Sequence, residues 1–66
     1  MRLIVNGDPR DFKDGATVTA LLAALDLDPR RLGVERNREI VPKSIYAETR
    51  LADGDVIEIV HFVGGG

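Results

Sequence analysis

The residues best suited to chemistry lie at the C-terminal end of the sequence. The strand-like segment 61–63 gives way to Gly64, Gly65 and Gly66, which carries the terminal carboxylate. Glycine has no Cβ, so such a segment can thread a narrow channel and adopt backbone angles closed to other residues. The pattern predicts a carboxylate that is delivered into the active site of another enzyme. An inert tail or a cloning remnant is the competing interpretation, because chain ends are often disordered.

The other polar side chains offer little independent catalysis. Asp53 and Asp55 flank a glycine, and turn formation explains this pattern better than acid–base chemistry. Ser44, His61 and Asp55 are the residue types of a catalytic triad, but no nucleophile elbow accompanies them. His61 is the only histidine and the sequence has no cysteine, so a metal site lacks its usual ligands. We therefore expect no catalytic residue and no metal site in this chain.

Length and composition indicate one small domain. The 66 residues are 44% hydrophobic, which is ordinary for a globular protein near the lower size limit for a self-sufficient core. The formal net charge of -2 gives no electrostatic reason to bind nucleic acid. Five of the nine basic residues fall between Arg30 and Lys43, where they form either a dock for an acidic partner or a solvated face. No segment approaches the ~20 apolar residues of a membrane span, and the lack of cysteine fits the cytoplasm.

The N-terminal residues predict a β-hairpin. One strand covers 2–6 and the return strand covers about 9–13. Asn6 and Gly7 form the turn, because both residues tolerate the positive φ that a tight hairpin demands. Pro9 has no N–H to give to a ladder, so the return strand should lie at a sheet edge.

A helix follows the hairpin. Thr17 is the predicted N-cap. The Asp28–Pro29 step disfavours helical geometry at residue 28, so the helix should end near Asp26 or Leu27. Four apolar residues occur at the i, i+3, i+4 and i+7 spacing of one helical face: Val18, Leu21, Leu22 and Leu25.

The second half of the sequence predicts three strands and one short helical turn. The last strand is the most convincing, because it is rich in β-branched residues. In chain order the predicted elements are a strand over 32–36, a turn at 37–38, a short strand over 39–41 closed by Pro42, a helical turn over 45–47 capped by Ser44, a turn at 53–55 and a strand over 56–63.

This order of elements predicts an α+β fold in which one helix packs across one face of a mixed sheet of about five strands. Side chains alternate along a strand, so Ile57 and Ile59 should face the helix. Val60 and Phe62 then point the opposite way and, with Val63, are candidate residues for docking a partner. Single exposed apolar residues are also normal on surfaces, which is the alternative. Residues 1–63 are the predicted domain and 64–66 a flexible glycine tail.

Several segments together resemble a known family. The order of elements resembles the β-grasp, or ubiquitin-like, fold, and within that fold nearly the whole chain resembles the ThiS family of sulfur carriers in thiamine biosynthesis. The sequence departs from the family pattern in having three terminal glycines, where two are generally needed, and Lys43 where arginine is frequent. The matching segments are Asn6-Gly7, Val34-Glu35-Arg36-Asn37, Ile40-Val41-Pro42, Leu51-Ala52-Asp53-Gly54-Asp55-Val56-Ile57-Glu58-Ile59-Val60 and Val63-Gly64-Gly65-Gly66.

The resemblance implies a carrier on which partner enzymes act. An adenylating enzyme that holds ATP and magnesium would join the Gly66 carboxylate to AMP. Sulfur from a persulfide donor protein would then displace AMP and leave Gly66 as a thiocarboxylate. A thiazole synthase would take up this sulfur, with Gly64 and Gly65 threading into the active sites of the partners. The carrier itself would bind no cofactor, and nucleic acid and membranes would not be its partners.

Two other interpretations stay open. The chain can be a carrier of the same fold for another pathway, such as molybdopterin synthesis. It can also be a protein modifier that forms an isopeptide bond through Gly66, or an interaction module that does not use its terminus.

Overall fold

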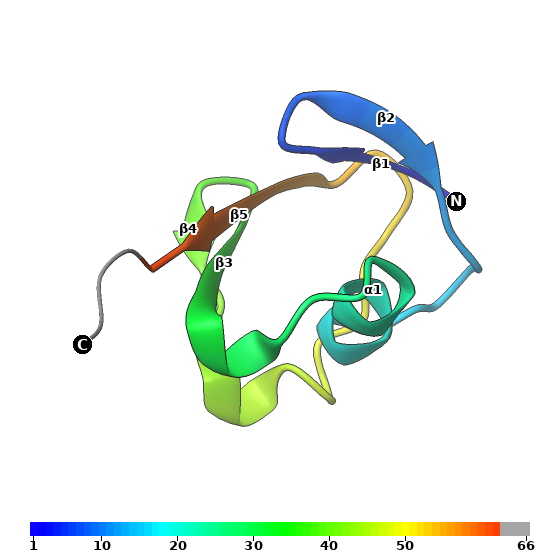
Figure 1. Cartoon of the computed structure of the whole chain (residues 1–66). Helices are drawn as coiled ribbons and strands as arrows, with labels where there is room; N and C mark the ends of the chain where they lie inside the picture. The colour runs from blue at the N-terminus through cyan, green and yellow to red at the C-terminus, as the bar shows by residue number, and fades with distance from the viewer. Residues whose placement is uncertain (63–66) are drawn as a thin grey trace.

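The computed structural model describes residues 1–62, and the segment 63–66 lies outside the described residues. One α-helix packs against a five-stranded sheet whose strands curve around it (Figure 1). The elements in chain order are β1 (Arg2–Val5), β2 (Asp8–Asp11), α1 (Val18–Ala24), the 3-10 helix η1 (Pro29–Arg31), β3 (Leu32–Arg36), β4 (Glu39–Ile40), the 3-10 helix η2 (Lys43–Ile45) and β5 (Val56–His61).

The strand order β2-β1-β5-β3-β4 places the last strand at the centre of the sheet. β5 runs parallel to β1 and antiparallel to β3, while the two outer pairs are antiparallel hairpins. The predicted mixed sheet of five strands with one helix is therefore confirmed. A central strand has neighbours on both sides, so β5 is held along both edges before the chain reaches its C-terminal residues.

The first hairpin forms as its turn residues predict. Asn6 and Gly7 have φ values of 48° and 86°, in the left-handed region. Pro9 lies in β2, which is an edge strand. β2 ends two residues earlier than predicted, although the Phe12 N–H still donates to the Met1 carbonyl at 2.8 Å.

Helix α1 begins where predicted and ends earlier. The hydroxyl of Thr17 accepts a hydrogen bond from the Ala20 N–H at 3.1 Å. The last helical residue is Ala24, because Asp26 turns into the left-handed region with φ of 57°. The Asp26 and Leu27 N–H groups then donate to the carbonyls of Ala23 and Leu22. This is the Schellman arrangement, which satisfies the terminal carbonyls of the helix two or three residues before the predicted end.

The core lies between α1 and one face of the sheet. The predicted helix face is buried at Val18, Leu21 and Leu22, while Leu25 is only partly covered. Ile57 and Ile59 of β5 face this helix, as predicted. Burial of this apolar area, at roughly 25 cal/mol per Å², is the main stabilising term for so small a domain.

Three shorter elements differ from prediction. Ser44 does not cap a helical turn: it lies inside η2, which follows Pro42 and has no side-chain cap. The 3-10 helix η1 is not predicted from the sequence; its cap is Asp28, whose side chain accepts from the Arg30 N–H at 2.9 Å. β4 is one residue shorter than predicted, although the Val41 N–H still donates to the Val34 carbonyl at 2.9 Å.

Candidate functional site

The C-terminal segment that is predicted to deliver the terminal carboxylate follows β5, and only the end of β5 and Phe62 lie within the described residues. β5 ends at His61, and the Phe62 N–H donates to the Arg31 carbonyl at 3.0 Å. The chain is therefore still bonded to its neighbour at residue 62, one residue beyond the strand. The candidate residues Val63, Gly64, Gly65 and Gly66 lie outside the described residues.

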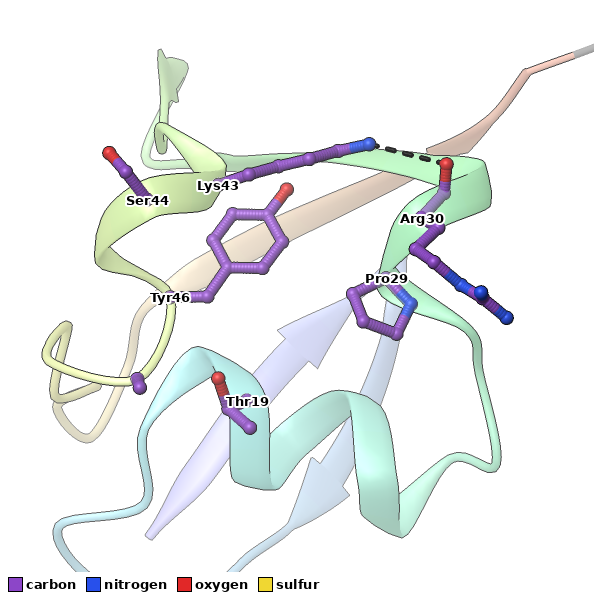
Figure 2. A pocket seen from close by; sticks show the side chains of 7 residues that line it. Thr19, Pro29, Arg30, Lys43, Ser44 and Tyr46 are labelled. Atoms are coloured by element: carbon purple, nitrogen blue, oxygen red, sulfur yellow. Dashed lines mark hydrogen bonds between the residues drawn. The ribbon is translucent and has the colours of Figure 1, made fainter.

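The ring of Phe62 is seated in a specific place. A Cβ built on Gly33 of β3 would lie 3.6 Å from Cζ of this ring, an ordinary van der Waals distance, so the ring packs against β3 at Gly33. The ammonium of Lys43 lies 5.1 Å from the ring centroid, within the range of a cation–π contact. The same ammonium donates to the Arg30 carbonyl at 3.3 Å, as Figure 2 shows. Phe62 is nonetheless 61% exposed, so the ring is both positioned and accessible.

Val60 and Phe62 belong to an exposed apolar surface. Val60 is 54% exposed and lies directly opposite Gly33 in the pairing of β5 with β3. Because side chains alternate, Val60 shares the sheet face opposite to the one that α1 covers. We call this surface the open sheet face; its exposed large apolar residues are Ile40, Val56, Val60 and Phe62. Of the three candidate docking residues, the two that the structure describes therefore lie together on one accessible face.

Asp55 anchors the beginning of β5. It follows Gly54, whose φ of 88° makes the predicted turn. The carboxylate is only 7% exposed and accepts from Arg36 Nε at 2.8 Å, Asn37 Nδ2 at 3.1 Å and the Ala52 N–H at 2.8 Å. Burial by itself raises the pKa of Asp55, but these hydrogen bonds outweigh it and hold the pKa below its ordinary value. Asp55 is thus an ionised structural group.

The two turn asparagines hold β5 from opposite sides. The side-chain oxygen of Asn6 accepts from the Ile59 N–H at 2.7 Å, and its amide donates to the Ile59 carbonyl at 3.2 Å. Asn37 accepts from the Val56 N–H at 2.9 Å and donates its own backbone N–H to the Val56 carbonyl at 2.8 Å. The sequence indicated these asparagines only as turn residues; the bonds to β5 join residues distant in sequence.

The side chains that resembled a catalytic triad are not brought together. Asp55 precedes the first residue of β5, His61 is the last residue of that strand, and Ser44 lies in η2. Within residues 1–62, no group of three or more His, Cys, Asp or Glu side chains is arranged to hold a metal ion. No helix in the described part of the chain is long and apolar enough to cross a membrane.

A shallow hollow of about 390 Å³ lies between α1, η1 and η2. In Figure 2 the Tyr46 ring, Pro29 and Thr19 face this space, whereas the guanidinium of Arg30 points away from it. Tyr46 is 4% exposed, and burial raises the pKa of its hydroxyl above the ordinary value despite a hydrogen bond from the Val34 backbone. None of the residues that line the hollow is a carboxylate or a histidine.

The basic cluster noted in the sequence does not form a single surface. Arg36 is directed at Asp55, with Nε 2.8 Å from Oδ2. Arg30 pairs with Asp28 at 3.0 Å on the surface of η1, and the Arg30 guanidinium and N–H lower the pKa of Asp28 to about 2. Part of the cluster is therefore committed to ion pairs within the chain.

A sheet of this order with one helix packed across it defines a β-grasp protein. The chain matches the ThiS family over residues 3–66 and belongs to that family. Both the predicted fold and the predicted family are thereby confirmed.

The relatives differ in length. The chain is 52% identical over 65 residues to the sulfur carrier protein ThiS of Bacillus subtilis, covering 97% of this chain and 98% of that protein. It is 54% identical over 66 residues to a thiazole synthase of Paramagnetospirillum magneticum and 39% identical to one of Magnetococcus marinus. The chain spans only 20% of the length of each of these two synthases. The crystal structure of the thiamine biosynthesis protein ThiS of Geobacter metallireducens matches with a TM-score of 0.87 and 36% identity, over 100% of both chains.

Proposed function

We propose that this chain is a sulfur carrier in thiamine biosynthesis and that the sulfur is borne as a thiocarboxylate on Gly66. The observation that carries the proposal is the family match, which extends to Gly66. The 52% identity to a named sulfur carrier over nearly the full length of both chains supports it. The chain is acted upon and is not itself an enzyme; its working place is the cytoplasm.

The chemistry begins with activation of a poor electrophile. The Gly66 carboxylate attacks the α-phosphorus of ATP, pyrophosphate leaves, and a mixed anhydride with AMP forms. The terminal sulfur of a protein persulfide then attacks the acyl carbon and AMP leaves. A thiol cleaves the resulting acyl disulfide, so its S–S bond is reduced to the thiocarboxylate while the thiol is oxidised to a disulfide. The adenylating enzyme supplies ATP and magnesium, and the persulfide donor supplies the sulfur.

The folded body presents the C-terminal residues to these enzymes. β5 has a neighbouring strand on both sides. The Phe62 N–H donates to the Arg31 carbonyl, and the Phe62 ring lies beside the ammonium of Lys43. Val60 and Phe62 offer exposed apolar area for docking next to this point. Two relatives are named thiazole synthases, which supports a thiazole synthase as the enzyme that takes the sulfur.

Sulfur loading tests this proposal directly. The protein is incubated with ATP, magnesium, the adenylating enzyme and a persulfide donor, and its intact mass is measured. The expected result is a mass increase equal to replacement of one oxygen by sulfur. Failure of the wild-type chain to gain this mass would contradict the carrier function, and higher-mass conjugates on lysine would indicate a protein modifier.

Gly65→Val tests the need for a slim terminal segment. The β-branched side chain should block entry into the adenylating enzyme, so we expect loading to be abolished while the circular dichroism spectrum and unfolding midpoint are unchanged. Ala23→Val, on the exposed side of α1, is the matched control and should load normally. Normal loading of the Gly65 variant would refute the steric argument and leave the carrier function standing.

A further inference from the structure

Two glutamates lie directly opposite each other on the open sheet face. In the pairing of β3 with β5, Glu35 is the partner of Glu58. Glu58 shares the face of Val60 because the two are separated by two positions along β5. Directly opposed side chains in an antiparallel pair have Cβ atoms about 4.5–5.5 Å apart. The two side chains therefore lie side by side on this face, where Glu58 is exposed and Glu35 is half-buried.

Neither carboxylate forms an ion pair within the described part of the chain. None of the ion pairs formed among residues 1–62 includes Glu35 or Glu58. The nearest cation in sequence, Arg36, points to the opposite side of β3 and is bonded to Asp55. Like charges directly opposite each other on a sheet are unfavourable. A cation placed between the two carboxylates would relieve this repulsion.

Exposed apolar side chains frame the glutamate pair. Val56 and Val60 flank Glu58 along β5. Ile40 of β4 is the partner of Glu35 in the sheet and is 78% exposed. A carboxylate pair inside an apolar patch is suited to a partner that presents one basic residue among apolar ones, because interface cores combine apolar side chains with arginine.

We propose that the open sheet face docks on a thiazole synthase and that one arginine of this enzyme inserts between Glu35 and Glu58. The inference rests on the proposed function, and the thiazole synthase is chosen because two relatives with that name contain a segment matching this whole chain. A planar guanidinium can donate to both carboxylates at once and is more weakly hydrated than an ammonium, so arginine fits the site better than lysine. The two glutamates thus contribute to the choice of partner and not to the stability of the free carrier.

The test uses Glu35→Gln, Glu58→Gln and the double variant, with Glu48→Gln, an exposed glutamate outside the sheet, as the matched control. Binding to the thiazole synthase of the same organism is measured by surface plasmon resonance at low and high salt. We expect the double variant to bind about tenfold or more weakly, with a smaller salt dependence, and each single variant to lie between. The Glu48 variant should bind like the wild type.

Two further measurements separate docking from folding and from the carrier function. The urea midpoint of the double variant should equal or exceed that of the wild type, because a repulsion has been removed. Wild type and double variant should acquire sulfur at the same rate. The inference alone is overturned if the double variant binds the synthase as tightly as the wild type does. It is also overturned if the double variant loses binding only to the adenylating enzyme. A wild-type chain that never acquires sulfur overturns the proposed function and this inference together.

Discussion

Asp55 illustrates how a single buried carboxylate is stabilised by groups from separate parts of the chain. It accepts hydrogen bonds from Arg36, from Asn37 and from the backbone of Ala52. These donors compensate for the loss of water around the carboxylate. They also join the β3–β4 turn to the residues that lead into β5. The network is thus a connection between elements as well as a local turn.

Replacing Asp55 by alanine should destabilise the protein. Arg36, Asn37 and the Ala52 N–H would lose their shared acceptor in a partly buried place, so we expect a loss of about 1–3 kcal/mol in the free energy of unfolding. Urea denaturation followed by circular dichroism measures it. Glu48→Ala, at an exposed position, should change the same quantity by less than about 0.5 kcal/mol. Equal midpoints for the two variants would contradict the structural role of Asp55.

At the scale of elements, β5 depends on its neighbours for more than backbone pairing. The β1–β5 ladder pairs only two residues of each strand, Ile4 with Val56 and Val5 with Ile57. The Asn6 side chain extends this pairing by bonding to both backbone groups of Ile59. A turn residue therefore also lengthens the contact of β1 with the strand that leads to the C-terminal segment.

Asn6→Gly tests this contact because glycine keeps the positive φ and loses only the side-chain bonds. We expect the free energy of unfolding to fall by about 1–2 kcal/mol and the Ile59 amide to exchange hydrogen faster. Asn6→Asp is the comparison, since it keeps an oxygen to accept from the Ile59 N–H and should protect that amide better than glycine does. Unchanged exchange at Ile59 in the glycine variant would show that the side-chain bonds are dispensable.

For the whole molecule, carboxylates with lowered pKa values couple stability to pH. A carboxylate whose pKa is lower in the folded state than the unfolded value of about 3.9 contributes stability above that unfolded value, and this contribution is lost as pH falls through the folded pKa. Asp55 is the most buried carboxylate of this kind in the described chain, and Asp28, Asp11 and Asp14 at the surface share the direction. Acid should therefore weaken the fold.

We expect the free energy of unfolding to be nearly constant from about pH 7 to about pH 5 and to fall at pH values below about 4. Asp55→Asn removes the titrating carboxyl, so this variant starts less stable at neutral pH and loses less stability on acidification. Urea titrations across this pH range measure both effects. Identical losses in the variant and the wild type would mean that the lowered pKa of Asp55 does not govern acid stability.

The sequence by itself determined what depends on local patterns. The period of the apolar residues predicted α1 and the inward side of β5, and the lack of an N–H on Pro9 predicted its edge strand. The chemistry assigned to the glycine-rich end also rests on sequence and stays a prediction, since 63–66 lie outside the described residues. The cap of η2 was predicted wrongly and the end of α1 too late, because several cap geometries compete within a few residues.

Only the tertiary structure decided which distant residues meet. The bonds of Asp55 to Arg36, the seat of Phe62 between Gly33 and Lys43, and the opposition of Glu35 to Glu58 all follow from β5 lying between β1 and β3. A local pattern fixes which face of a strand a residue occupies, because side chains alternate. It does not fix which strand lies alongside or in what register, since these depend on how the whole core packs.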